Sequence, residues 1–255
     1  MTSNRKEQIC RLLKGIETGD PVSVSVVNEE KYIQHNPQTH EGSEGLAVLF
    51  KRLSKTSPRV NVVRAFEDGD FVFAHTEYDF ATRNIGFEVF RFENGQAVEH
   101  WDNIQKRTGP NDSGHSMVDG ATDVADLEKT ESNRSTIVSF VENVLIQGNI
   151  EKLNAYLNQE CYVEHNPSLG DNLVNLKSVL SGSDNDSSVS IKYKKCHRVL
   201  AEGNFVLSVC EGYVNQIPSS FFDLFRLDNG IIVEHWDTTE AIPPRTEWKN
   251  NNGKF

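Results

Sequence analysis

The spacing of apolar residues changes about fifty residues into the chain. Residues 4–18 carry apolar side chains three and four positions apart, namely Ile9, Leu12, Leu13 and Ile16, which predicts an amphipathic helix. Residues 45–54 are predicted to form another helix. Four segments dominated by apolar and β-favouring residues follow and predict strands: 59–67, 70–80, 84–93 and 96–105. Helices followed by consecutive strands indicate an α+β domain, with helices on one face of an antiparallel sheet.

The same order recurs in the second half of the chain. NEEKYIQHNP at 28–37 returns as NQECYVEHNP at 158–167, and EVFRFENGQAVEHWD at 88–102 returns as DLFRLDNGIIVEHWD at 223–237. The corresponding helices are predicted at 134–147 and 172–180, and the corresponding strands at 189–200, 204–214, 219–228 and 231–240. A repeat this long indicates a duplicated domain rather than a solenoid unit. We predict domains at 1–108 and 131–255, joined by a linker at 109–130 that is rich in Gly, Ser, Asp and Thr.

The turn before each VEHWD motif leaves two hairpin registers open. Asn94-Gly95 could form a two-residue type I′ turn, or Glu93 could join them in a three-residue loop with a bulge. We favour the three-residue loop, which pairs Glu88 with His100 and Phe90 with Val98 and groups Asp102 on their face. The equivalent register in the second copy pairs Asp223 with His235 and Phe221 with Asp237.

Both faces of each predicted sheet carry apolar residues. Phe87, Val89 and Trp101 lie on the face opposite His100, and a helix layer covers only one face. The other face needs a second cover, so we predict that the two copies pack sheet to sheet as a pseudo-dimer. Trp101 and its counterpart Trp236 are then expected to anchor this pairing, because aromatic residues are the usual anchors of such surfaces.

Charge, cysteine content and the length of the apolar runs indicate which kinds of partner and which compartment to expect. The 255-residue chain has a formal net charge of −11, which disfavours nucleic acids and anionic membrane surfaces as partners. Its four cysteines show no CxxC spacing and predict reduced thiols. The first residues lack the apolar core of a signal peptide, and no apolar run approaches the ~20 residues of a membrane span. We therefore expect a cytoplasmic protein whose partner is a small molecule; further oligomerisation stays open.

The motifs YIQHNP, DGDFV and FRFENGQAVEHWD occur in this order and resemble those of SnoaL-like polyketide cyclases, members of the nuclear transport factor 2-like superfamily. The resemblance covers both copies and implies two cone-shaped domains, each with a curved sheet and an apolar pocket. It implies an intramolecular aldol condensation that needs no metal or organic cofactor. The acid/base aspartate of the family falls on Asp102 and Asp237. The family's pocket histidine is replaced here by Glu88 and Asp223.

The candidate catalytic residues follow from these positions. An aspartate beside apolar residues, a carboxylate and an imidazole is suited to proton abstraction next to a carbonyl, so Asp102 and Asp237 are candidate bases. Their alternative role is structural, at the end of a strand. His100 with Glu88, and His235 with Asp223, are candidate dyads; alternatively, each pair only satisfies two buried polar groups.

Further candidates are assigned to substrate binding. The HNP motifs place His35, Asn36, His165 and Asn166 near the predicted pocket mouth, although Asn-Pro is also an ordinary turn sequence. His75, Glu77 and Glu211 are the remaining predicted binding residues, and His75 aligns with Val209 in the second copy. The histidines show no short metal-ligand spacing such as HExxH, so we predict no metal.

Together these features predict a lyase or isomerase that acts without a cofactor on a small, largely apolar carbonyl compound. The same features are compatible with two other functions. The pockets could bind an apolar ligand without catalysis, or side chains could fill them in a purely structural pseudo-dimer.

Overall fold

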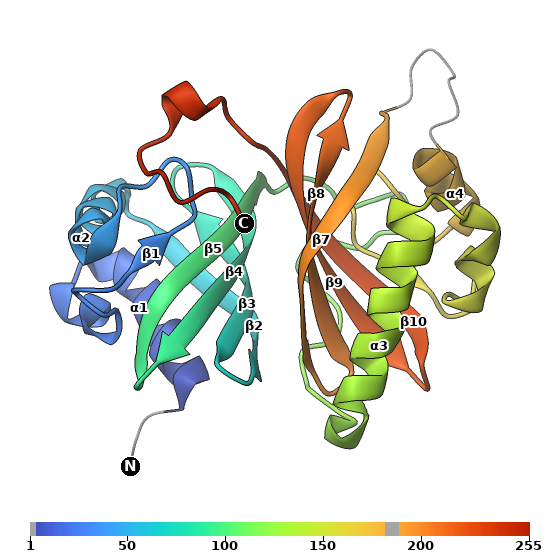
Figure 1. Ribbon diagram of the computed structural model, residues 1–255, viewed down its shortest axis with the longest axis horizontal. Helices are drawn as coiled ribbons and strands as arrows, with labels where there is room; N and C mark the ends of the chain where they lie inside the picture. The colour runs from blue at the N-terminus through green and yellow to red at the C-terminus, as the bar shows by residue number, and fades with distance from the viewer. Residues whose placement is uncertain (1–3, 182–188) are drawn as a thin grey trace. The chain divides into compact units, whose positions relative to one another are not determined.

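The computed structural model describes residues 4–181 and 189–255 (Figure 1). The chain forms two compact units. One comprises Met1–Arg107 together with Ile242–Phe255, and the other comprises Thr108–Ala241. The packing thus groups the last residues of the chain with the first repeat, and the segment after the first repeat with the second. The predicted sheet-to-sheet pairing of the two units stays a prediction.

The first unit is a five-stranded sheet with helices on one face (Figure 1). The strands lie in the order β1-β5-β4-β3-β2. Their bounds are β1 Ile33–Gln34, β2 Arg59–Asp68, β3 Phe71–Asp79, β4 Arg83–Glu93 and β5 Gln96–Lys106. The helices are α1 Arg5–Thr18 and α2 Gly42–Leu53, with short 3₁₀ segments η1 Pro21–Val26 and η2 Ser54–Thr56.

The second unit repeats this order (Figure 1). Its sheet runs β6-β10-β9-β8-β7. The strands are β6 Val163–Glu164, β7 Ile191–Glu202, β8 Phe205–Val214, β9 Ile217–Asp228 and β10 Ile231–Ala241. The helices are α3 Thr130–Phe140, a π-helical turn η4 Val141–Ile146, and α4 Leu173–Ser181. Short 3₁₀ segments of this unit are η3 Leu127–Lys129 and η5 Ile150–Ala155, whereas η6 Arg245–Glu247 belongs to the first unit.

The predicted α+β class, with four long antiparallel strands and helices on one sheet face in each copy, is confirmed. The sheet is mixed rather than purely antiparallel, because the two-residue strand β1 pairs in parallel with β5. Apolar side chains of α1 fix the helix layer on the sheet: Ile9 and Leu12 are at most 1% exposed and share a core with Val72 and Phe90. Asn4 caps the start of α1, and Gly19 ends it with a positive φ of 67°.

The predicted hairpin register is wrong by two positions. Asn94 and Gly95 form a two-residue turn with φ of 49° and 81°, as the type I′ turn requires. The extra residue is a bulge at Val98 instead of a longer loop, because the pairing shifts between Phe92↔Ala97 and Arg91↔Glu99. This shift of two residues preserves the alternation of the side chains, so the predicted grouping of residues by face survives.

The cross-strand partners in both hairpins differ from those predicted. Glu88 lies opposite Asp102, and Phe90 lies opposite His100. In the second copy Asp223 lies opposite Asp237, and Phe225 opposite His235. Each carboxylate of β4 or β9 therefore sits directly beside the candidate base.

Each unit includes a strap, an irregular segment contributed by the end of the other repeat. The first strap is residues 242–255, where the Nδ2 of Asn250 donates to the backbone oxygens of Asn36 and Thr39 at 2.7 and 3.0 Å. The second strap is residues 109–126, where the Nδ2 of Asn111 donates to the backbone oxygen of Glu164 at 2.6 Å. Both straps thus bind the strand-and-loop segment that contains the HNP motif.

Gly120 shows how closely the second strap approaches the sheet. Its φ is 90°, and an added Cβ would lie 2.0 Å from a carboxylate oxygen of Glu234. Only glycine fits this position without displacing the strap.

Among the residues with described positions, no helix has the combination of length and apolar composition that crossing a membrane requires.

Candidate active site

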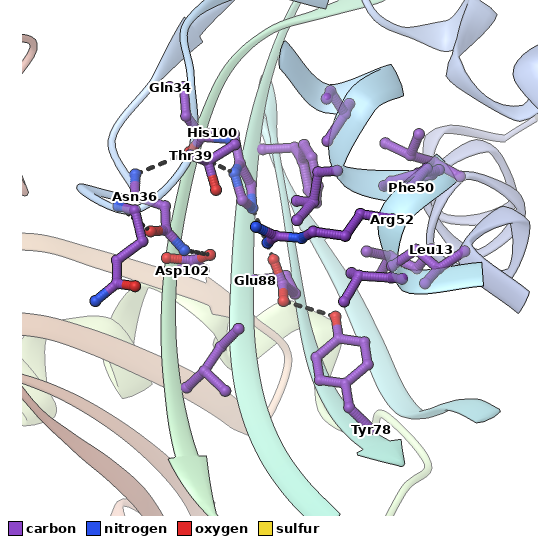
Figure 2. Close-up of a pocket in the computed structure, with 18 of the residues that line it drawn as sticks. Leu13, Gln34, Asn36, Thr39, Phe50, Arg52, Tyr78, Glu88, His100 and Asp102 are labelled. Carbon is purple, nitrogen blue, oxygen red and sulfur yellow. Dashed lines mark hydrogen bonds and ion pairs between the residues drawn. The ribbon is translucent and has the colours of Figure 1, made fainter. Parts of the chain in front are cut away.

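The first unit encloses a pocket of about 210 Å³ between its helices and its sheet (Figure 2). Leucine and phenylalanine side chains of α1 and α2 form much of its wall, for example Leu12, Leu46 and Phe50. Polar groups from β1, the loop after it, β4 and β5 lie on the sheet side: Gln34, Asn36, Glu88, His100 and Asp102. The volume is many times what one water needs, so the pocket admits a small molecule.

The short strand β1 carries the HNP loop to the polar end of the pocket. Its parallel pairing with β5 sets Gln34 beside His100, and the side-chain oxygen of Gln34 lies 3.0 Å from His100 Nδ1. The same oxygen accepts from the backbone N–H of Asn36 at 2.8 Å. A turn from Asn36 to Thr39 then directs the chain towards α2. Gln34 therefore fixes both the imidazole and the loop.

Glu88, His100 and Tyr78 form a buried hydrogen-bond network. His100 Nε2 lies 2.7 Å from one carboxylate oxygen of Glu88, and the hydroxyl of Tyr78 donates to the other at 2.6 Å (Figure 2). Burial raises the pKa of Glu88, against the lowering effect of its hydrogen bond with His100. Burial and the nearby Glu88 raise the pKa of Tyr78 well above 10, so this phenol remains a donor at neutral pH.

In the described part of the chain, Asp102 and Tyr32 each bring a buried polar atom without a hydrogen-bond partner to the pocket lining. Asn36 Nδ2 donates to Asp102 Oδ2 at 2.7 Å. Among the described residues, neither Asp102 Oδ1 nor the Tyr32 hydroxyl has a hydrogen-bond partner, and both residues line the pocket. Burial raises the pKa of Tyr32 well above 10, with the negative charge of Glu88 adding to the effect. The described lining of the pocket therefore contains one unpaired acceptor and one unpaired donor.

The first strap reaches the same aspartate from outside the pocket lining. The ammonium of Lys254 donates to the backbone oxygen of Asp102 at 2.8 Å and lies 3.6 Å from Asp102 Oδ1. Lys254 is only 4% exposed. The buried carboxylate therefore has a buried cation beside it.

The second unit has a smaller pocket with different electrostatics. Its volume is about 50 Å³, and Asn166, Asp223, His235 and Asp237 are among its lining residues. Asn166 Nδ2 donates to both oxygens of Asp237, at 2.9 and 2.8 Å. Burial raises the pKa of Asp237 to about 7, and the nearby acidic groups Glu164 and Asp223 add to the increase, although His235 opposes it.

His235 lies between two carboxylates, whereas His100 contacts one carboxylate and one amide. His235 Nδ1 is 3.0 Å from Glu164, and Nε2 is 3.2 Å from Asp223. Burial alone would lower the pKa of His235, but the two carboxylates raise it well above 6.5. The replacement of Gln34 by Glu164 therefore adds a negative charge to the second site.

The remaining predicted binding residues lie outside the two pocket linings. His35 and His165 stack on Trp101 and Trp236, with ring centroids 4.7 Å apart in each pair. Each histidine also binds its strap, because Nδ1 of His35 lies 2.9 Å from the oxygen of Gly253 and Nδ1 of His165 lies 2.8 Å from that of Ser116. His35 and His165 therefore hold the straps in place beside the two sites.

His75, Glu77 and Glu211 do not line either pocket. His75 pairs across the strands with Phe87 and stacks on its ring at 4.4 Å, so it shares the sheet face opposite Glu88. Glu77 forms an ion pair with Arg107 on the same side, and Glu211 lies 3.3 Å from His197. The alternation along β3 and β8 explains the placement: these positions point away from the helix layer.

Several site residues were missing from the sequence-based candidates: Tyr32, Gln34, Arg52, Tyr78, Tyr193 and Lys254. Tyr32 and Gln34 belong to the YIQHNP motif, which recurs as YVEHNP, so the repeated motif was an available signal. Tyr193 of β7 donates to Asp223 at 3.0 Å, as Tyr78 of β3 does to Glu88. The same role is therefore taken by tyrosines on non-equivalent strands of the two units.

Glu88, His100 and Asp102 have donor atoms within 4.8 Å of one another, a spacing that a metal ion could use. Both ring nitrogens of His100 are, however, hydrogen-bonded to Glu88 and Gln34. Asp102 Oδ2 is bonded to Asn36. We assign the three residues to a hydrogen-bond network rather than to a metal centre.

Comparisons with known proteins give matches among solved structures only. No protein-family model matches the chain, and no curated protein does. TsrD from Streptomyces laurentii is similar at 19% identity over 40% of this chain and 87% of its own, with a TM-score of 0.36. A putative polyketide cyclase from Bacillus cereus matches at 17% identity over 38% of this chain and 72% of its own, with a TM-score of 0.35. An epoxide hydrolase from M. tuberculosis matches at 20% identity over 44% of this chain and 85% of its own, with a TM-score of 0.34.

Proposed function

We propose that the first unit is a cofactor-independent lyase or isomerase that abstracts a proton next to the carbonyl group of a small, largely apolar compound. The observation that carries this proposal is the unpaired oxygen Oδ1 of Asp102. It is buried and lacks a hydrogen-bond partner among the described residues, and Asp102 lines a largely apolar pocket together with Tyr32. A carboxylate with a free lone pair in such a pocket is suited to act as a base.

Each residue of the site has a defined part in this reaction. Asp102 Oδ1 accepts the proton from carbon, and the electrons of the broken C–H bond form an enolate. Tyr32 donates a hydrogen bond to the developing oxyanion, which stabilises it most strongly where water is excluded. Asn36 holds the other oxygen of Asp102 at 2.7 Å and thereby orients the base.

The fate of the enolate decides the reaction class. If Asp102 returns the proton to another carbon of the conjugated system, the reaction is an isomerisation. If the enolate carbon attacks a second carbonyl of the same molecule, a C–C bond forms and the alkoxide takes up the proton, as in an aldol cyclisation. Both outcomes are balanced without a redox or metal cofactor.

The second unit supports a different function, non-catalytic ligand binding. Its pocket is about a quarter of the size of the first, and Asn166 hydrogen-bonds both oxygens of Asp237. A base whose oxygens are both engaged is a poor proton acceptor. We therefore assign the proposed chemistry to the first unit alone.

Exchange of carbon-bound protons in D₂O tests the proposed function whatever the final product is. EDTA-treated protein is incubated with a panel of small aryl and alkyl ketones, and loss of the α-proton signal is followed by ¹H NMR. We expect exchange of at least one ketone well above the rate with buffer alone. Ketone binding without exchange would instead support a binding module, and the absence of both across the panel would support a structural role.

A further inference from the structure

The strap of the first unit places its penultimate residue against the candidate base. Asn250 and Asn252 bind the backbone of the HNP loop and β1 through Asn36, Thr39 and Gln34. His35 fixes the next residue by its 2.9 Å contact with Gly253. These contacts leave the side chain of Lys254 little freedom, and it lies 4% exposed beside Asp102.

The two straps differ in the charge that they bring to their units. The first brings the ammonium of Lys254 to 3.6 Å from Asp102 Oδ1. The second brings a carboxylate, because Asp119 Oδ1 lies 2.7 Å from Nδ1 of His165. Among the described residues, no lysine or arginine forms an ion pair with Asp237. The repeats therefore share their anchoring contacts but differ in electrostatics at the base.

We propose that Lys254 is a positioning residue that stabilises the negative charge of the Asp102 carboxylate and so confines catalysis to the first unit. This inference rests on the proposed function. A buried carboxylate loses hydration, and an adjacent buried cation compensates for that loss. Because the ammonium donates its short hydrogen bond to the backbone oxygen at 2.8 Å, it stabilises the charge of the side chain without occupying Oδ1.

Other titratable and charged groups also lie near Asp102. Burial, with the charge of Asp102 as a smaller cause, raises the pKa of Glu88 on β4, and His100 on β5 is hydrogen-bonded to Glu88. Tyr32 and Tyr78 remain neutral phenols because burial raises their pKa values. Arg52 on α2 also lines the pocket. Lys254 is the charged group that the strap adds to this set.

Carboxyl ¹³C NMR titration tests this role without relying on activity. We expect Lys254→Met to move the pH midpoint of the Asp102 carboxyl signal upward, because the charge beside it is lost, with the signal assigned from Asp102→Asn. Lys254→Gln, which also removes the charge but keeps an N–H donor, is expected to move it in the same direction. The Asp237 signal in the same spectra serves as an internal control and should not move.

Lys249→Met is the matched control, because it removes an exposed positive charge from the same strap. An unchanged Asp102 midpoint in whichever Lys254 variant folds would overturn the proposal. So would an equal shift in Lys249→Met. If the midpoint moves as expected but no ketone exchanges, the proposed function fails while the role of Lys254 in ionisation stands.

A separate observation concerns the mouth of the same pocket. Arg52 of α2 lines the pocket, and in Figure 2 its side chain points inward, towards Glu88 and His100. Among the described residues it forms no ion pair or hydrogen bond. The pocket of the second unit has no lysine or arginine in its described lining. The first pocket therefore has a cation without an anionic partner above an otherwise apolar wall.

We infer that Arg52 binds an anionic group, such as a carboxylate, at the end of the ligand opposite the carbonyl. This inference also rests on the proposed function. A guanidinium binds a carboxylate through two parallel N–H donors and so selects planar anions. The ligand would then be a keto acid whose apolar body lies against α1 and α2 and whose carbonyl reaches Tyr32.

Calorimetry with benzoylpropanoate and benzoylpropanamide tests this specificity, since the two probes share the aryl ketone and differ in the anionic group. We expect wild type to bind the acid about threefold to tenfold more tightly than the amide. Arg52→Gln should abolish this preference, whereas Arg52→Lys should retain part of it. Equal binding of both probes to wild type, or a preference that survives Arg52→Gln, would overturn the inference. If neither probe binds, both the inference and a ketone-binding pocket are contradicted.

Discussion

Asp102→Asn is expected to lower the rate of ketone α-proton exchange by about 10²–10⁴-fold, the contribution of a positioned general base. The amide has nearly the shape of the carboxylate, so Tyr32 and the apolar wall remain in place. It cannot accept a proton from carbon at a useful rate. The exchange assay in D₂O measures this loss directly, and a ligand that still binds the variant locates the effect in the chemical step.

Asp237→Asn is the matched control, since it makes the same substitution at the equivalent position of the second repeat. It should retain wild-type exchange, because both oxygens of Asp237 are already bonded to Asn166. Full activity in Asp102→Asn would show that another group is the base. Equal losses in both variants would show that the two units share the chemistry.

Asp102→Asn should also lower the free energy of unfolding, by about 1–3 kcal/mol, while leaving the protein folded. The substitution leaves the ammonium of Lys254 buried without its carboxylate, and breaking one side of a buried ion pair is costly. The remaining hydrogen bond of Lys254 to the backbone oxygen limits the loss. Urea denaturation at pH 7 measures it.

Much of the fold could be predicted because the same order of helices and strands is encoded in both repeats. The helix periodicity and the four strand segments each recur, and the strands lie within a few residues of their predicted bounds. The shared face of Glu88, His100 and Asp102 also followed from alternation along the strands. A register error of two residues changed the partners of these residues but left them on one face.

What could not be predicted depends on contacts between distant segments. Lys254 is 152 positions from Asp102, and no local pattern links them. β1 has only two residues, too few for a periodic pattern of side chains to predict it. Its pairing with β5 nevertheless positions Gln34. The role of Tyr78 passes to Tyr193 on a different strand, so alignment of the repeats could not identify the pair. The differences between the two sites that involve Lys254 and the two tyrosines therefore became visible only in three dimensions.

The buried carboxyl group of Asp237 in the second unit destabilises the folded protein at neutral pH, and a single substitution should remove this effect. The pKa of Asp237 is raised to about 7 from its usual value of 3.8, so folding favours the protonated form. Its stabilising contribution is present below about pH 4 and is lost as the pH rises from about 4 to about 7. A shift of about three units corresponds to about 4 kcal/mol. Partial solvent contact and coupling to His235 reduce the expected effect to about 2–3 kcal/mol.

Asp237→Asn should therefore be more stable than wild type at pH 8, by about 2 kcal/mol, and nearly equal to it at pH 4. The amide stays neutral at every pH and can still accept a hydrogen bond from Asn166, as the protonated acid does. Urea denaturation of both proteins from pH 4 to pH 8 should show the difference growing up to about pH 7 and then levelling. Asp102→Asn, measured alongside, should have the opposite sign at pH 8, because it removes the partner of Lys254. Asp237→Asn could instead be no more stable than wild type at pH 8, or less stable. Either result would mean that Asp237 is ionised in the folded protein at neutral pH, and that the two aspartates are electrostatically alike.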